Sequence, residues 1–143
     1  MNENAKKWVE ALRSGKYRQA TGKLCKIDDC DHSYCCLGVA CELYQQEVGG
    51  LDIKIERDIR FYNEKSSDLP FCVMDWLGLA GPEGNHIAME ESLAYKNDSG
   101  DTFDEIADLI ESEPKGLFGN APALLPLTRL FLHFCLPFTE AII

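Results

Sequence analysis

The sequence predicts a small α+β domain, with a short, mainly antiparallel sheet (a β-hairpin plus one or more strands) packed by three to four helices. Apolar residues recur at helical spacing in several separate segments. A polar, turn-rich run separates two short segments with strand character. The length of 143 residues and the 45% share of hydrophobic residues suit one globular unit.

The first expected helix covers residues 4–14, with Asn4 as its cap and Gly15 beyond its end. The apolar side chains of one face are Ala5, Trp8, Val9 and Leu12. A β-hairpin follows, with its tip near residues 28–32. Residues 37–48 then have the spacing of a second helix.

Residues 51–62 alternate loosely and predict one more strand. Asp68, two residues before Pro70, is expected to cap a third helix. The last helix is the clearest, because Thr102 and Glu105 have the spacing of a capping box. Proline at position 114 ends it.

Residues 1–116 are expected to form a single domain, and residues 117–143 an apolar C-terminal tail that packs or forms oligomers. No membrane span is expected, because a span needs about 20 uninterrupted apolar residues. The tail is interrupted by Pro126, Arg129, His133 and Pro137. A terminus that packs poorly is a further alternative.

Charge divides the chain unevenly. The net charge is −10, yet residues 1–26 carry +5 and residues 27–143 carry −15. An acidic body argues against direct DNA reading, which needs a basic footprint. The basic N-terminal part could hold an anion locally, or it could be an ordinary solvated surface.

Seven cysteines without an apolar N-terminal segment predict a reducing setting, with the cytosol as the expected location. Soft ligands on a hairpin could converge on zinc in the tetrahedral geometry that it prefers. The candidates are Cys25, Cys30, His32 and Cys35. The alternative is that such cysteines are small buried hydrophobes. No other cofactor is expected.

The candidate ligand-binding residues fall in two segments. Arginine forks beside an aromatic ring suit a phosphate and a stacked base, which favours Arg13, Lys16, Tyr17, Arg18 and Gln19. Asn97 and Asp98, just before the last helix, would contact a ribose or base. The run from Asn97 to Glu105 lacks the pattern of an EF-hand, and turn and capping roles account for most of it. No common catalytic motif is present, so no catalytic residue is assigned.

Three blocks in this order resemble a family of small uncharacterised tailed-phage and prophage proteins. They are Lys7 to Gln19 (K-W-V-E-A-L-R-S-G-K-Y-R-Q), Tyr34 to Tyr44 (Y-C-C-L-G-V-A-C-E-L-Y), and Asn97-Asp98-Ser99-Gly100 through Ile110-Glu111. The likeness covers about residues 5–112. It implies an accessory protein expressed in the bacterial host cytoplasm, which counters host defence by binding a host protein or a nucleotide-derived signal.

The preferred hypothesis is therefore a non-enzymatic, phage-type accessory protein that sequesters a small nucleotide-like ligand, with homo-oligomerisation through the tail. The alternative is an acidic interaction module that inhibits a host protein by presenting the charge of a nucleic acid. A metal-assisted hydrolase is the third hypothesis.

Overall fold

The computed structural model describes residues 1–86 and 91–119. The described part is an α+β domain of five helices and one five-stranded sheet, one or two helices more than predicted. The elements in chain order are α1 (Glu3–Arg13), β1 (Arg18–Gln19), β2 (Cys25–Asp28), β3 (Asp31–Tyr34), α2 (Cys36–Glu47), β4 (Ile53–Glu56), β5 (Ile59–Tyr62), α3 (Phe71–Leu77), α4 (Leu93–Asp98) and α5 (Phe103–Glu111).

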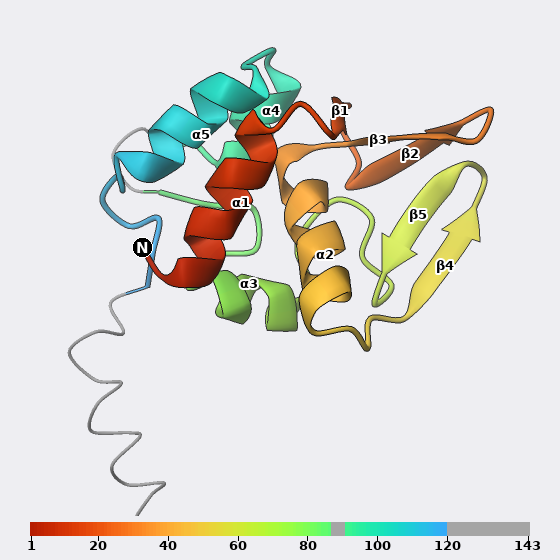
Figure 1. The fold of residues 1–143 in the computed structure, drawn as a ribbon, viewed down its shortest axis with the longest axis horizontal. Coiled ribbons are helices and arrows are strands. Elements are labelled where there is room, and N and C mark those ends of the chain that lie inside the picture. Colours follow the sequence, from red (N-terminus) through yellow and green to blue (C-terminus); the bar gives the residue numbers. More distant parts are fainter. Residues whose placement is uncertain (87–90, 120–143) are drawn as a thin grey trace, which may run out of the picture.

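The helices gather at one side of the molecule and the sheet extends from the other (Figure 1). α1 packs against α2, α3 and α5, and α2 also contacts α3 and α4. Segregation of helices to one end of a mainly antiparallel sheet is a standard α+β arrangement. α2 follows β3 directly, so it joins the helical part to the sheet.

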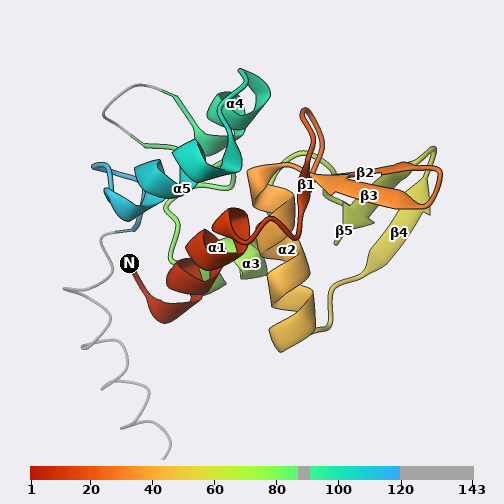
Figure 2. The same cartoon turned by 45° about the horizontal axis from the view of Figure 1, so that its top comes forward.

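The strand order is β1-β3-β2-β5-β4, and every pairing is antiparallel except that of β1 with β3. The predicted hairpin is present, because β2 and β3 flank a turn at Asp29 and Cys30. Two strands rather than one occupy residues 51–62, joined at Arg57 and Asp58. The two hairpins project together beyond α2 (Figure 2).

The core forms where α1 meets the first turns of α2. The predicted face of α1 is buried, and Trp8 Nε1 donates a hydrogen bond of 2.8 Å to the Cys36 carbonyl. Gly38 of α2 lies against the backbone before β2, where an added Cβ would be 1.8 Å from the Leu24 carbonyl oxygen. Glycine is therefore the residue that lets α2 approach the sheet.

The helix ends confirm one predicted cap and correct two. Thr102 and Glu105 form the expected capping box of α5. Asn2, not Asn4, caps α1, while Asn4 donates a hydrogen bond to the Trp76 carbonyl. Pro70 occupies the N-cap position of α3 and makes no side-chain bond there, so Asp68 is not the cap.

The core continues past the predicted domain end at residue 116. Leu117 is fully buried, and its carbonyl accepts a hydrogen bond of 2.9 Å from the Ala80 N–H. Gly119 N–H is bonded to the Gly78 carbonyl at 2.9 Å. No helix within residues 1–86 and 91–119 is long and apolar enough to cross a membrane. The predicted tail from residue 120 onward lies outside the described residues.

Candidate functional site

The two predicted ligand-binding segments lie side by side. The end of α4 lies beside β1, and Gln19 Nε2 donates a hydrogen bond of 2.8 Å to Asn97 Oδ1. The structure thus brings Gln19, Asn97 and Asp98 together. These residues are far apart in the chain: Asn97 also contacts Ala20, which lies 77 positions before it.

Asn97 is fully buried and its amide is committed to internal bonds. Its Oδ1 also accepts a bond of 3.2 Å from the Cys36 N–H at the start of α2, and its Nδ2 donates to the Ala20 carbonyl at 2.8 Å. Asp98 Oδ1 accepts a bond of 2.8 Å from the Gly22 N–H. These bonds fasten the loop after β1 to two helices, a role that uses the polar atoms expected to meet a ligand.

Arg13 is held by acids of the neighbouring helix. Its guanidinium lies 2.7 Å from Asp108 Oδ1 and also contacts Glu111 on α5. Hydrogen bonds to both carboxylates raise the pKa of Arg13, although burial opposes this. Arg13 therefore fixes α1 to α5 and has little positive charge left to offer an anion.

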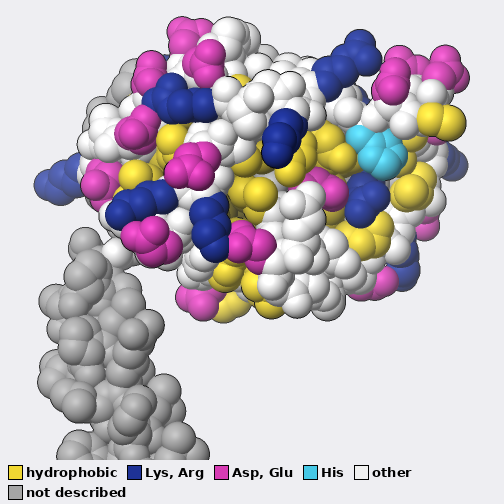
Figure 3. Space-filling view, viewed as in Figure 1, with side chains coloured by type: hydrophobic (Ala, Val, Ile, Leu, Met, Phe, Trp, Pro, Cys, Tyr) yellow, Lys and Arg dark blue, Asp and Glu magenta, His cyan; other side chains and the backbone are white. Residues whose placement is uncertain are grey.

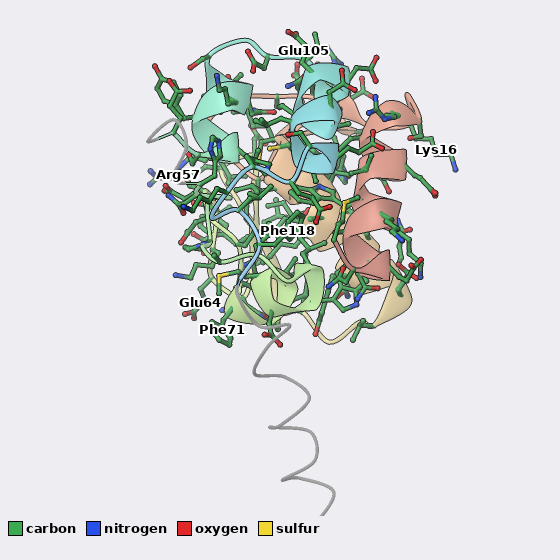
Figure 4. All side chains as sticks on the ribbon, turned by 90° about the vertical axis from the view of Figure 1, so that its left-hand side faces the viewer. Lys16, Arg57, Glu64, Phe71, Glu105 and Phe118 are labelled. Atoms are coloured by element: carbon green, nitrogen blue, oxygen red, sulfur yellow. The ribbon has the colours of Figure 1, made fainter. Side chains whose placement is uncertain are left out.

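Among the predicted ligand-binding residues, the side chains of Lys16, Tyr17 and Arg18 are the least constrained by polar contacts. Lys16 projects from the side of the molecule away from Arg57, which lies at the tip of the second hairpin (Figure 4). Arg18 Nη1 is 3.9 Å from Asp31 Oδ2, and both side chains are exposed, so this pair is weak. The Tyr17 ring packs edge-on against Tyr34, with ring centroids 5.5 Å apart.

Two shallow hollows flank Tyr17. One, of about 390 Å³, lies between α1 and α2 and includes Lys7, Lys16 and Tyr17. Its cations are balanced by Glu10 and Glu47, and Lys7 Nζ lies 2.5 Å from Glu47 Oε1. The other, of about 270 Å³, includes Arg13, Tyr17 and Gln19. Four predicted residues therefore line these two hollows, and among the described residues Lys16 is the one of them that adds a cation without an ion pair.

The predicted zinc ligands lie on strands, at a hairpin tip and at the start of a helix. Cys25 pairs in register with Tyr34 rather than with Cys35, because the chain leaves the strand there and Cys35 caps α2. Cys30 is exposed at the hairpin tip, and His32 is on β3. Within residues 1–86 and 91–119, no three His, Cys, Asp or Glu side chains are grouped to hold a metal ion.

Burial disfavours the thiolate form of the inner cysteines. Desolvation raises the pKa of Cys25 and of Cys35 to about 11 in each case. It raises the pKa values of Cys36 and Cys41 well above the ordinary value. These cysteines behave as the small buried hydrophobes of the alternative interpretation.

A polar cluster that the sequence did not predict ties α2 to the sheet. The Tyr62 hydroxyl donates a hydrogen bond of 2.5 Å to Glu42 Oε2, and Arg60 Nε lies 3.4 Å from the same oxygen. Desolvation and the Glu42 carboxylate both raise the pKa of Tyr62. The Arg60 guanidinium lies over the Tyr62 ring, 5.4 Å from its centroid. The cluster is largely enclosed and serves packing.

The segment that contains α4 and α5 is rich in acids. Residues 91–113 have one base, Lys96, and a net charge of −7. The acids are Glu91, Asp98, Asp101, Asp104, Glu105, Asp108, Glu111 and Glu113. The space-filling view shows acidic side chains around the end of the molecule where α4 and α5 lie (Figure 3).

A third hollow, of about 640 Å³, opens beside α4. Three acids line it, Glu83, Glu91 and Asp98, together with Tyr95, whose surface is 57% exposed. We call this hollow and the outer face of α5 the acidic α4–α5 surface. It was not located from the sequence because no helix is predicted for residues 93–98, although a count of charges from residue 91 to residue 113 would have located it.

Fold and surface together define a small α+β domain with a charge-segregated exterior. The chain belongs to a family described as "Domain of unknown function (DUF8296)", whose model matches residues 1–114. No curated protein and no solved structure matches the chain.

Proposed function

We propose that this protein is a phage-type accessory protein that acts by binding another protein, and that its acidic α4–α5 surface docks against a basic surface of a host protein. The observation that carries the proposal is the concentration of acids on this surface around an exposed tyrosine. The net charge of −7 within residues 91–113, which ion pairs with Arg13 and the N-terminal amine offset only in part, favours a cationic partner.

The hollow beside α4 suits a basic side chain. The exposed Tyr95 ring offers a face for cation–π contact with arginine or lysine. The Glu83 carboxylate lines the same hollow and can pair with the cation, whereas Asp98 Oδ1 already accepts the Gly22 N–H. Glu91 contributes less, because its Oε2 lies 2.9 Å from Lys96 Nζ.

The test uses an arginine-rich peptide as probe and the full chain with matched variants. Anisotropy titrations should show binding by the native protein that weakens steeply as salt is raised. Glu83→Lys and Tyr95→Ala should each weaken binding. Glu64→Lys makes the same charge change at the opposite end from Glu105 and should not (Figure 4). Equal loss in all three variants would contradict the proposal.

The same variants then serve to recover the partner from a bacterial host. A captured protein supports the proposal only if Glu83→Lys abolishes its capture, Glu64→Lys preserves it, and its contact surface is basic. Capture that Glu83→Lys leaves unchanged would place the contact elsewhere and overturn the assignment of the surface.

Sequestration of a nucleotide-like ligand is the second candidate, favoured by the hollow that Lys7, Lys16 and Tyr17 line. Native mass spectrometry of protein purified from bacterial cells tests it. A mass excess that matches a nucleotide, and that disappears in Lys16→Glu, would support this function. An excess of one zinc ion per chain would instead indicate metal binding by cysteines.

A further inference from the structure

β4 leaves a free edge at the outer side of the sheet. It is the last strand in the order β1-β3-β2-β5-β4, and no strand within residues 1–86 and 91–119 pairs with its far side. The opposite edge, β1, is two residues long, whereas β4 runs for four. β4 is accordingly the outermost strand in Figure 1.

The backbone of β4 presents its unused groups at alternate residues. The two-residue turn makes Glu56 and Ile59 a hydrogen-bonded pair, and the bond from the Asn63 N–H to the Asp52 carbonyl at 2.8 Å continues this alternation. The N–H and carbonyl groups of Ile53 and Ile55 therefore point away from β5. Unpaired groups of this kind are a template for another strand.

The side chains of β4 complement a second copy of the same strand. We propose that β4 pairs antiparallel with β4 of a second copy, about a two-fold axis at Ile55. In that register the Ile55 residues of both copies exchange backbone hydrogen bonds. Lys54 of each copy then faces Glu56 of the other, so two opposite-charge pairs flank the axis.

Two other registers would also set the unused backbone groups of the two copies opposite each other, but each meets an obstacle. An axis at Lys54 would set Lys54 against Lys54 and Asp52 against Glu56, which places like charges opposite each other on both sides. An axis at Ile53 would pair Ile55 with Leu51 of the second copy. The Leu51 N–H already donates to Gln45 Oε1 at 3.0 Å, so it cannot join a ladder.

Exposed apolar surface adds to the contact. Ile55 is 56% exposed in the single chain, and the two-fold axis would bring it against its own counterpart. The charged neighbours limit pairing with unrelated strands. Axes at Ile55 and at Ile53 both set unlike charges opposite each other, but only the axis at Ile55 leaves Leu51, whose N–H is bonded to Gln45, out of the ladder. This interface is independent of the acidic α4–α5 surface, which lies on other elements.

Charge exchange between positions 54 and 56 tests the proposal on the full chain. Sedimentation velocity at low salt should show the native protein in concentration-dependent monomer–dimer exchange. Lys54→Glu and Glu56→Lys should each weaken dimerisation by about tenfold or more, because both convert two attractive pairs into repulsive ones. The double variant Lys54→Glu/Glu56→Lys should regain the native dimer affinity.

The controls are Lys16→Glu and Glu10→Lys, which make the same charge changes at exposed positions on α1 or just after it, away from the hollow that Lys54 and Glu56 share with Glu64. Both should dimerise as the native chain does. The proposal is overturned if the native protein stays monomeric at its highest soluble concentration. It is also overturned if a dimer ignores all four charge changes, or if the double variant stays monomeric while its circular dichroism matches that of the native chain.

Discussion

At the scale of the residue, one buried amide organises the contact between the loop after β1 and the two helices beneath it. Asn97 is enclosed in the core, yet its Oδ1 accepts two hydrogen bonds and its Nδ2 donates two. An amide suits this position because it is both donor and acceptor. Full satisfaction of a buried polar group lets it specify a contact rather than weaken the core.

Asn97→Ala is therefore expected to lower the free energy of unfolding by about 2–4 kcal/mol, since it leaves the Gln19 amide, the Cys36 N–H and the Ala20 carbonyl without this partner. Urea denaturation measures the change. Gln19→Ala supplies the matched comparison. If the two residues act as one unit, the double variant should lose less stability than the two single losses together. Strict additivity would contradict that interpretation.

The thiols give a second prediction, which depends on pH. With pKa values raised to about 11, Cys25 and Cys35 are almost entirely protonated at pH 8, where about one thiol in a thousand is a thiolate. Iodoacetamide at pH 8 should therefore modify exposed Cys30 before either of them. Peptide mass mapping reports the order. The same reaction in concentrated urea should modify all three, and early modification of Cys25 in the folded state would refute the assignment.

At the scale of the element, the approach of α2 to the sheet explains the residue types found at positions 35–39. In Cys35-Cys36-Leu37-Gly38-Val39 the first cysteine caps the helix through its Sγ, which accepts a bond of 3.4 Å from the Gly38 N–H. Gly38 then leaves room for the Leu24 carbonyl. The block thus encodes a tight junction between β3 and α2.

Gly38→Ala should lower the free energy of unfolding by about 2 kcal/mol or more, despite the better helix propensity of alanine. The reason is that the new methyl group would collide with rigid backbone and force α2 away from β2. Chemical denaturation again gives the value. Gln46→Ala is the control, because it changes an exposed position of the same helix and should have an effect near zero. A neutral Gly38→Ala would mean that the junction can open without cost.

The elements that the sequence predicted correctly are those whose pattern involves residues close together in the chain. The apolar face of α1 and the Thr102 capping box depend on neighbours within one or two turns, and both are present. The second hairpin was missed because Arg57-Asp58 lacks the Asn-Gly or Asp-Gly signature of a two-residue turn. The role of Asn97 depends on partners about 60 to 80 positions away, which no local pattern encodes.

At the scale of the whole molecule, the acid-rich segment that contains α4 and α5 and the free strand edge lie on different elements. The net charge of −7 lies within residues 91–113, whereas β4 belongs to the projecting hairpins. A dimer through β4 would therefore carry two acidic surfaces, both left open for partners. Two such surfaces on one assembly would raise the affinity for a repeated basic target without new contacts.

The extent of the folding unit is the last prediction at this scale. Every buried core residue of the described part lies between Ala5 and Leu117, and the backbone bonds that hold the end of this unit run to Leu117 and Gly119. A chain ending at residue 119 should therefore unfold cooperatively at nearly the denaturant concentration of the full chain. A chain ending at residue 116 should lose about 2–4 kcal/mol, because it lacks the fully buried Leu117.

Urea unfolding followed by circular dichroism compares the two truncated chains with the full one. Phe118→Ala in the chain ending at residue 119 is the intermediate case, since Phe118 packs against the core without being fully buried. Its stability should fall between those of the two truncations. If the chains ending at 116 and 119 were equally stable, Leu117 would contribute nothing to the core, and the unit would close at the boundary predicted from the sequence. If both lost their cooperative transition, residues beyond 119 would be part of the folding unit.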